Sequence, residues 1–258
     1  MDIGTLARDK DCLLETVLFA GKLLLENGAE TSRVEDTMER IIRSAIGDPR
    51  PASDYTYVTV NGIFVKLNSG GSQFQRIDKR QYDLNKICGI NQISRDFAAG
   101  RISLQDMRHR LFAIERDVCK LKLWHKFICT ACLSGSIILL FGGSFVDVPA
   151  AIFAGLVAYF MHSWLTRALH APFLPEYGAA LLSGVAGYIA FTYRGVHLDL
   201  IMMGAVAPLV PGIAITNAIR DMMARHYISG MIVAIEALFT ASALGASIAS
   251  AYYLFFGK

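Results

Sequence analysis

Charged residues are scarce in the second half of the sequence. Residues 127–258 contain 5 Lys and Arg and 5 Asp and Glu, whereas residues 1–126 contain 20 and 17. A water-soluble domain needs a charged surface to stay dissolved. The scarcity therefore excludes a soluble second half and indicates one that has lipid as its solvent.

Motifs of several other protein classes are also missing. The sequence has no nucleotide-binding glycine loop, no H-E-x-x-H, no G-x-S-x-G and no paired C-x-x-C. We therefore predict no enzyme, no cofactor and no metal site; the single C-x-x-C, Cys129 to Cys132, is better explained by small packing residues. No basic stripe with interleaved aromatics points to a nucleic-acid partner. The N-terminus lacks the apolar stretch of a signal peptide, so we expect none to be removed.

Five apolar segments fill the second half, and each approaches the ~20 residues needed to cross a bilayer. They are residues 127–145, 148–165, 177–193, 198–215 and 227–256. We predict a mainly α protein, with a five-helix transmembrane bundle over residues 127–258. A re-entrant fourth segment would reduce the count to four.

The Lys and Arg residues near the ends of these segments predict the orientation. Six of them precede the first segment, namely Arg108, Arg110, Arg116, Lys120, Lys122 and Lys126. Arg167, Arg220 and Arg225 lie in the connections that would be on the same side. Because such residues stay in the cytoplasm, residues 1–126 should be cytoplasmic, and five crossings put the C-terminus on the outer face.

Residues 1–126 are predicted to form a small cytosolic α+β domain. Two helices within 11–46 are separated by Asn27–Ser32, where Gly28 suits a helix C-terminus and Thr31 or Ser32 an N-cap. Residues 55–60 and 63–67 predict a hairpin that turns at Asn61-Gly62, with a possible third strand over 73–77. Helices should follow over 82–98 and 103–125. Ser103 should cap the last one, which is expected to run on into the membrane.

The most informative stretch of the second half is residues 205–221. Pro208 and Pro211, followed by Gly212, cannot continue a regular helix, and a broken helix is tolerated in a membrane where it is buried or lines a wet cavity. The restarted helix would present N–H groups near Gly212 that suit a carboxylate. Asn217 and Asp221 share one face beyond it. These five residues are the candidate substrate site; the alternative is a plain proline kink followed by a solvated loop.

Other ionisable residues stand out in both halves. Glu236 lies about two turns into the last apolar segment and is the candidate for proton or ion coupling, with helix–helix contact as the open alternative. His162 and His170 flank the inner end of the second segment, where capping is favoured over proton transfer. Glu30, Arg33 and Glu35 form either an acid–base group or a cluster of caps and ion pairs.

Three stretches together resemble the threonine/serine exporter family. They are Asn27–Glu35, which holds the cytosolic motif residues Gly28, Glu30, Arg33 and Glu35, the strand region 55–67, and residues 208–221. The resemblance extends over about residues 12–256. It implies export of small carboxylates, which are threonine and serine for fused members and succinate for two-protein members of the YjjP/YjjB type. Only the first of two membrane halves is matched. A separate small, YjjB-like membrane protein is therefore implied to carry the second half, in an inverted-repeat arrangement.

We therefore expect a subunit of a secondary transporter in the bacterial inner membrane. It would export succinate or a related dicarboxylate, or threonine and serine, and use the proton gradient, since no ATP-binding signature is present. The alternative is a membrane-anchored enzyme or sensor that acts through the cytosolic domain. A mere anchor needs neither the Pro-x-x-Pro-Gly break nor Glu236, and this favours the transporter.

Overall fold

The computed structural model describes residues 3–46, 56–66, 72–117, 122–169 and 171–256. The fold is mainly helical, with one three-stranded sheet. Its contacts divide the chain into two compact units: residues 1–119 with 215–234, and residues 120–214 with 235–258. The division predicted near residue 126 differs in one respect, because residues 215–234 pack with the first unit.

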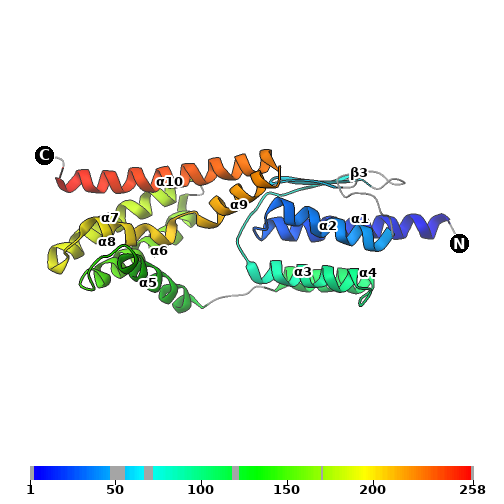
Figure 1. Ribbon diagram of the computed structural model, residues 1–258, viewed down its shortest axis with the longest axis horizontal. Helices are drawn as coiled ribbons and strands as arrows, with labels where there is room; N and C mark the ends of the chain where they lie inside the picture. The colour runs from blue at the N-terminus through cyan, green and yellow to red at the C-terminus, as the bar shows by residue number, and fades with distance from the viewer. Residues whose placement is uncertain (1–2, 47–55, 67–71, 118–121, 170, 257–258) are drawn as a thin grey trace. The chain divides into compact units, whose positions relative to one another are not determined.

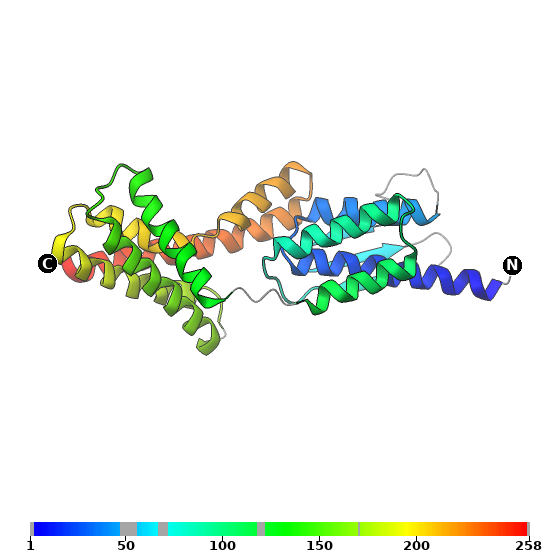
Figure 2. The ribbon, with the colours of Figure 1, turned by 90° about the horizontal axis from the view of Figure 1, so that it is seen from below.

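The first unit has three layers (Figures 1 and 2). The middle layer is α1 (Ile3–Glu26) and α2 (Thr31–Ile46). An antiparallel sheet in the order β1-β2-β3 packs on one side of it, made of β1 (Thr56–Thr59), β2 (Gly62–Lys66) and β3 (Ser72–Arg76). On the other side are α3 (Leu84–Ala98) and α4 (Leu104–Arg116).

The core of this unit lies between the layers. Val58, Ile63 and Val65 are buried by alternation along β1 and β2, as the period of two in a strand requires. They join buried aliphatic residues of the helices, including Leu24 and Met38. Burial of these large side chains is the main force that holds the layers together.

Several local predictions for the first unit are confirmed. Gly28 has a positive φ of 86° after α1, and Ser103 forms a capping box with Asp106 at the start of α4. The third strand is present as β3. The hairpin differs by one residue, because Thr59 pairs with Gly62 and leaves Val60 and Asn61 as the turn. The predicted strand ends at 55 and 67 lie outside the described residues.

The helix predicted over 103–125 does not run on into the membrane segment. Helix α4 ends at Arg116, and Asp117 has an extended backbone with ψ 111°. Lys122 is also extended, and a new helix, α5 (Leu123–Leu140), starts after it. Aspartate has a low propensity for helix interiors, which favours an end to the helix at this residue.

The second unit is built around α6. It contains α5, α6 (Val148–Leu169), α7 (Leu174–Arg194), α8 (Leu198–Val206) and the short η2 (Ala207–Leu209), together with the start of α9 (Gly212–Met223) and most of α10 (Tyr227–Phe256). Helix α6 packs against α5, α7 and α8. Its buried positions are Ala150, Ala151, Ala154, Gly155 and Ala158. Small residues at these positions let the helix backbones approach closely.

Length and composition support fewer spans than the five predicted. Helices α5, α6 and α10 are long and apolar enough to cross a membrane. The bent pair of 198–209 and α9 gives a fourth if it is one span. Within the described residues, α7 is not among the helices that are both long and apolar enough to cross a membrane, so a fifth span stays a prediction. The fourth segment also extends beyond its predicted end at residue 215, because α9 continues to Met223.

Candidate functional site

The predicted helix break is present in the second unit. Helix α8 ends at Val206, Pro208 lies in η2, and Val210 has an extended backbone before Pro211. Helix α9 then starts at Gly212, at 64° to the preceding segment. Two prolines remove two helix-forming N–H groups within four residues, which accounts for the break.

Gly212 differs from its predicted role in one respect. Its backbone N–H donates to the carbonyl oxygen of Val210 at 2.8 Å, so this donor is already used. A Cβ atom added to Gly212 would have no heavy atom within 4 Å. The position is therefore open, and packing does not require glycine here.

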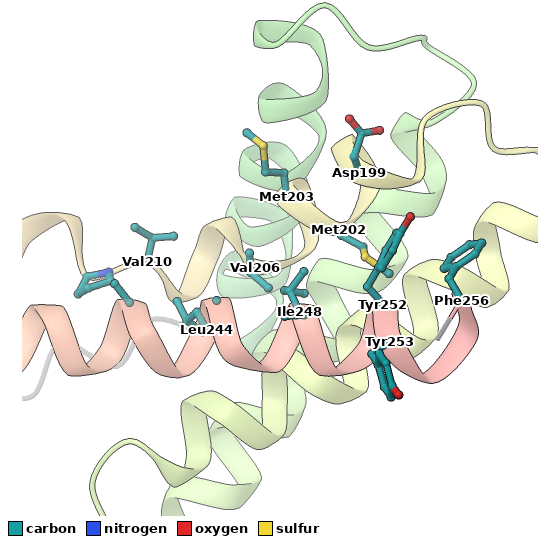
Figure 3. A pocket seen from close by; sticks show the side chains of 14 residues that line it. Asp199, Met202, Met203, Val206, Val210, Leu244, Ile248, Tyr252, Tyr253 and Phe256 are labelled. Carbon is teal, nitrogen blue, oxygen red and sulfur yellow. The ribbon is translucent and has the colours of Figure 1, made fainter. Parts of the chain in front are cut away.

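A groove of about 790 Å³ lies between the broken segment and α10 (Figure 3). Helix α8 contributes Asp199 near its start, and Val210 and Pro211 line the groove at the break. Helix α10 supplies the facing wall. Most of the lining is apolar: Met202, Met203, Val206, Val210, Pro211, Ala241, Leu244, Gly245, Ile248, Ala249 and Phe256, with Tyr252 and Tyr253.

The α10 wall of this groove contains a row of small residues. Ala241, Gly245 and Ala249 recur every four residues and so share one helix face. A Cβ atom on Gly245 would meet nothing within 4 Å. Such a face lets another helix approach closely. Together with the apolar lining, it suits a hydrophobic partner better than a carboxylate.

Glu236 does not line the groove. It is an exposed residue of α10 in the second unit, and its carbonyl oxygen accepts a hydrogen bond from Thr240 Oγ1 at 3.1 Å. Its role in proton or ion coupling, and the alternative of a helix–helix contact, stay predictions.

In the first unit, Asp221 is bound to the start of α2. Its Oδ1 accepts a hydrogen bond from the Thr31 backbone N–H and its Oδ2 one from Thr31 Oγ1, both at 2.9 Å. The Ser32 backbone N–H also donates to this carboxylate. Asp221 and Thr31 are 2% and 1% exposed. A residue 190 positions away thus supplies the cap of α2, where a negative charge is favourable.

Asn217 makes a second contact from α9 to the same turn. Its Nδ2 donates to the carbonyl oxygen of Gly28 at 3.1 Å. Gly28 has a positive φ, and a Cβ atom there would clash with the ring of Tyr82. Only glycine fits both restrictions.

Ion pairs surround these hydrogen bonds. Glu30 lies 3.5 Å from Arg220 and 3.7 Å from Arg33, and His226 Nε2 lies 3.2 Å from Glu35 Oε2. Burial raises the pKa of Glu35, and the neighbouring His226 offsets part of that rise. Glu30, Arg33 and Glu35 are thus engaged in ion pairs, which gives no separate support to an enzyme or sensor.

The predicted substrate-site residues do not stay together in one unit, and two of them contact the turn before α2. Asn217 and Asp221 contact Gly28 and Thr31 in the first unit, whereas Pro208 and Pro211 belong to the second. The sequence predicts a local N-cap at Thr31 or Ser32, but the Thr31 hydroxyl donates to Asp221 instead. The partner role of His226 was missed because residues far apart in sequence carry no pairing signal.

The sequence also did not predict the pair of Asp147 and His197. It links the α5–α6 connection to the α7–α8 connection in the second unit. Asp147 is fully buried and accepts hydrogen bonds from the Val196 backbone N–H at 2.7 Å and from His197 Nδ1 at 2.9 Å. Burial acts to raise the pKa of Asp147, but these hydrogen bonds outweigh it and the pKa is lowered. An Asp directly before an apolar helix was the available signal, since it is typical of an N-cap.

His162 also has a partner. Its Nε2 lies 3.4 Å from Glu176 Oε1 in the first turn of α7. The ion pair joins α6 to α7, which fits the structural role that the sequence favoured for this histidine. Over the described ranges, no group of three or more His, Cys, Asp and Glu side chains could hold a metal ion.

An apolar helical unit with a broken helix is typical of membrane transporters. The comparison with protein families agrees, because the ThrE family model, described as "Putative threonine/serine exporter", matches residues 15–255. The chain therefore belongs to the threonine/serine exporter family of membrane proteins. No curated protein and no solved structure shows significant similarity to it.

Proposed function

We propose that this chain is one subunit of a secondary transporter that exports small carboxylates across the bacterial inner membrane. The carboxylate would be threonine or serine, or succinate or a related dicarboxylate. The observation that carries the proposal is the family match over residues 15–255, which includes the helix break. In this proposal the N-terminal domain is cytoplasmic and the C-terminus lies on the outer face.

The transporter would be of the two-protein YjjP/YjjB type. A small, YjjB-like membrane protein would supply the second half and cover the groove along α10. Two features support this surface: its apolar lining, and the open row of Ala241, Gly245 and Ala249. Small residues on a membrane helix are where a second helix packs most closely.

Within this transporter, Pro208, Pro211 and Gly212 would form the break at which substrate passes. Asp221 and Asn217 would act as positioning residues, because their side chains are bound to Thr31 and Gly28. Glu236 remains the proposed proton-coupling residue, since a carboxylate in an apolar helix needs a functional reason.

The test is substrate efflux from bacteria that lack this protein and its partner. Cells that regain both proteins should export preloaded threonine, serine or succinate, and cells with either one alone should not. Absence of efflux for all three compounds with both proteins present would overturn the exporter. Efflux by this purified chain alone in liposomes would overturn the subunit proposal.

A matched pair of variants tests the groove. Gly245→Leu adds a side chain in the groove, whereas Ala246→Leu adds one at the next residue of α10, which does not line it. Both should insert, but only Gly245→Leu should lose co-purification with the partner and efflux. Equal co-purification of the two variants would show that the partner binds elsewhere.

A further inference from the structure

A cleft of about 380 Å³ lies in the first unit, over one face of α1. Helix α1 runs between β3 and α4, and these two elements form the walls of the cleft (Figure 1). The lining residues are Glu15, Leu18, Phe19 and Lys22 of α1, Gln73, Phe74 and Gln75 of β3, and Arg108 and Phe112 of α4. Sites for small molecules usually measure roughly 300–1,000 Å³. The cleft is therefore large enough for a small metabolite.

The floor of the cleft follows from the helical repeat of α1. Residues 15, 18, 19 and 22 recur at intervals of three and four, so they share one face of the helix. Leu18 belongs to the buried core, and Phe19 packs on Phe112 of α4 with 4.6 Å between the ring centroids. The cleft thus combines an apolar floor with charged and amide side chains.

Two opposite charges lie next to each other in the lining. Arg108 Nη2 donates to Glu15 Oε2 at 3.0 Å, and the two side chains are 40% and 55% exposed. An ion pair this exposed contributes little to stability, so a ligand can join or separate it at small cost. Arg108 has two further contacts, because its Nη1 donates to Cys12 Sγ at 3.5 Å and its guanidinium lies 5.9 Å from the centre of the Phe112 ring. The guanidinium is therefore held in place without Glu15.

These charges select a ligand that carries both signs. A simple anion would be attracted by Arg108 but repelled by Glu15, and a simple cation would meet the reverse. An α-amino acid has its carboxylate and its ammonium group on the same carbon, so it can pair with both side chains at once. The amides of Gln73 and Gln75 each offer donors and an acceptor, which suits the same pair of groups.

We propose that this cleft binds a free α-amino acid with an apolar side chain, such as leucine or phenylalanine. Arg108 pairs with the carboxylate, and Glu15 accepts hydrogen bonds from the ammonium group. The apolar side chain of the ligand lies on Leu18, Phe19 and Phe112. All of these residues belong to the first unit, whereas the helix break belongs to the second, so the inference does not rest on the proposed export.

Ligands that lack one charge test this recognition without any change to the protein. Isothermal titration of the full-length chain in detergent micelles compares L-leucine with isocaproate, which lacks the ammonium group, and with isopentylamine, which lacks the carboxylate. L-Leucine and L-phenylalanine should bind. Isocaproate and isopentylamine should each bind more weakly than leucine by about tenfold or more, the loss expected for one charge-assisted contact.

Two variants should then respond differently to these ligands. Glu15→Gln should weaken the binding of leucine but not that of isocaproate, which has no ammonium group to lose a partner. Arg108→Gln should weaken both by about tenfold or more, because both have a carboxylate. The control is Arg110→Gln, an exposed position of the same helix outside the lining, which should leave both affinities unchanged. Melting temperatures check that the three variants fold like the wild type.

Three results would overturn the site: no binding of leucine or phenylalanine by the wild type, equal affinity for leucine and isocaproate, or wild-type affinity for leucine in both Glu15→Gln and Arg108→Gln. The comparison of ligands on the wild type decides the matter should either variant fail to fold.

Efflux assays separate this site from the proposed function. Leucine binding that depends on Arg108, with no efflux of threonine, serine or succinate, would retain the site and overturn the exporter. Efflux of these compounds by a chain that binds neither leucine nor phenylalanine would retain the exporter and overturn the site.

Discussion

The interiors of the two units are built from different side chains. In the first unit the fully buried residues are large, such as Leu14, Leu24, Met38 and Ile63. In the second unit they are mostly small, such as Ala151, and its exterior carries large apolar side chains, for example Leu140 at 76% and Phe145 at 80% exposure. The same residue types thus occupy opposite places in one chain.

The solvent of each unit explains the difference. Large apolar side chains in the first unit gain stability by leaving water. In lipid that gain disappears, because a leucine side chain is equally well solvated by acyl chains. Close contact between backbones then decides the packing, and it requires Ala, Gly and Ser at the helix contacts.

The largest effect is expected from a substitution that disrupts the close backbone contacts between helices of the second unit. Gly155 lies on α6 where an added Cβ atom would clash with Ser134 of α5. Gly155→Leu should therefore abolish correct folding, because the helices must separate. Fluorescence-detected size-exclusion chromatography would measure the yield of monodisperse protein. The control is Gly245→Leu, where a Cβ atom meets nothing within 4 Å. Equal yields of the two variants would contradict the close contact.

Truncation of a large apolar side chain should lower stability strongly in the core of the first unit, but not on the exposed surface of the second. Leu24→Ala should destabilise α1 and α2 by ~2–5 kcal/mol, the usual range for a buried leucine. Leu140→Ala, at an exposed position of α5, should change stability by less than ~0.5 kcal/mol. Hydrogen–deuterium exchange in detergent reports both local unfolding energies. A comparable loss at Leu140 would show that this side chain is packed against protein.

The next largest effect concerns the link between Asp221 and Thr31. A double-mutant cycle of Asp221→Asn and Thr31→Val should give a coupling energy of ~1–3 kcal/mol, because both residues are buried and the valine removes the hydroxyl that donates to the charged Asp221 carboxylate. The hydrogen bond from the Thr31 backbone N–H remains in both single variants. Hydrogen exchange at the start of α2 provides the readout. Additive effects, with no coupling, would mean that the bond from the Thr31 hydroxyl does not stabilise the start of α2.

Elements with a strong local signal could be predicted from the sequence. Gly28 as a helix end, the Ser103 cap, the hairpin and the Pro208–Pro211 break each depend on neighbouring residues. Pairings such as Asp221 with Thr31 could not be predicted, because the two residues share no local pattern. The end of α4 was missed for a related reason: apolar periodicity continued past Asp117, and one unfavourable residue is a weak signal.

A smaller effect is expected from pH at the pair of Glu35 and His226. Burial raises the pKa of Glu35, aided by Asp36 and Glu39 and opposed by His226. Between the ordinary glutamate pKa and this raised value, the folded protein binds more protons than the unfolded one. Stability should therefore fall as pH rises through that window. The melting temperature should therefore depend less steeply on pH in Glu35→Gln than in the wild type. An unchanged dependence on pH would mean that other titratable groups cause it.

The smallest expected effect on stability is that of Gly212→Ala. The position is open, so the added methyl group needs no rearrangement, and alanine favours the helix that starts there by up to ~1 kcal/mol. A melting temperature at or slightly above that of the wild type is therefore expected. Efflux is the informative measurement. If substrate passes close to the backbone at the break, the methyl group should slow efflux although the fold is unchanged. If Pro208 and Pro211 only kink the helix, efflux should match the wild type. Gly212→Leu enlarges the obstruction at the same open site, so wild-type efflux by a stably folded Gly212→Leu protein would exclude the break as the substrate path and direct the search to Glu236.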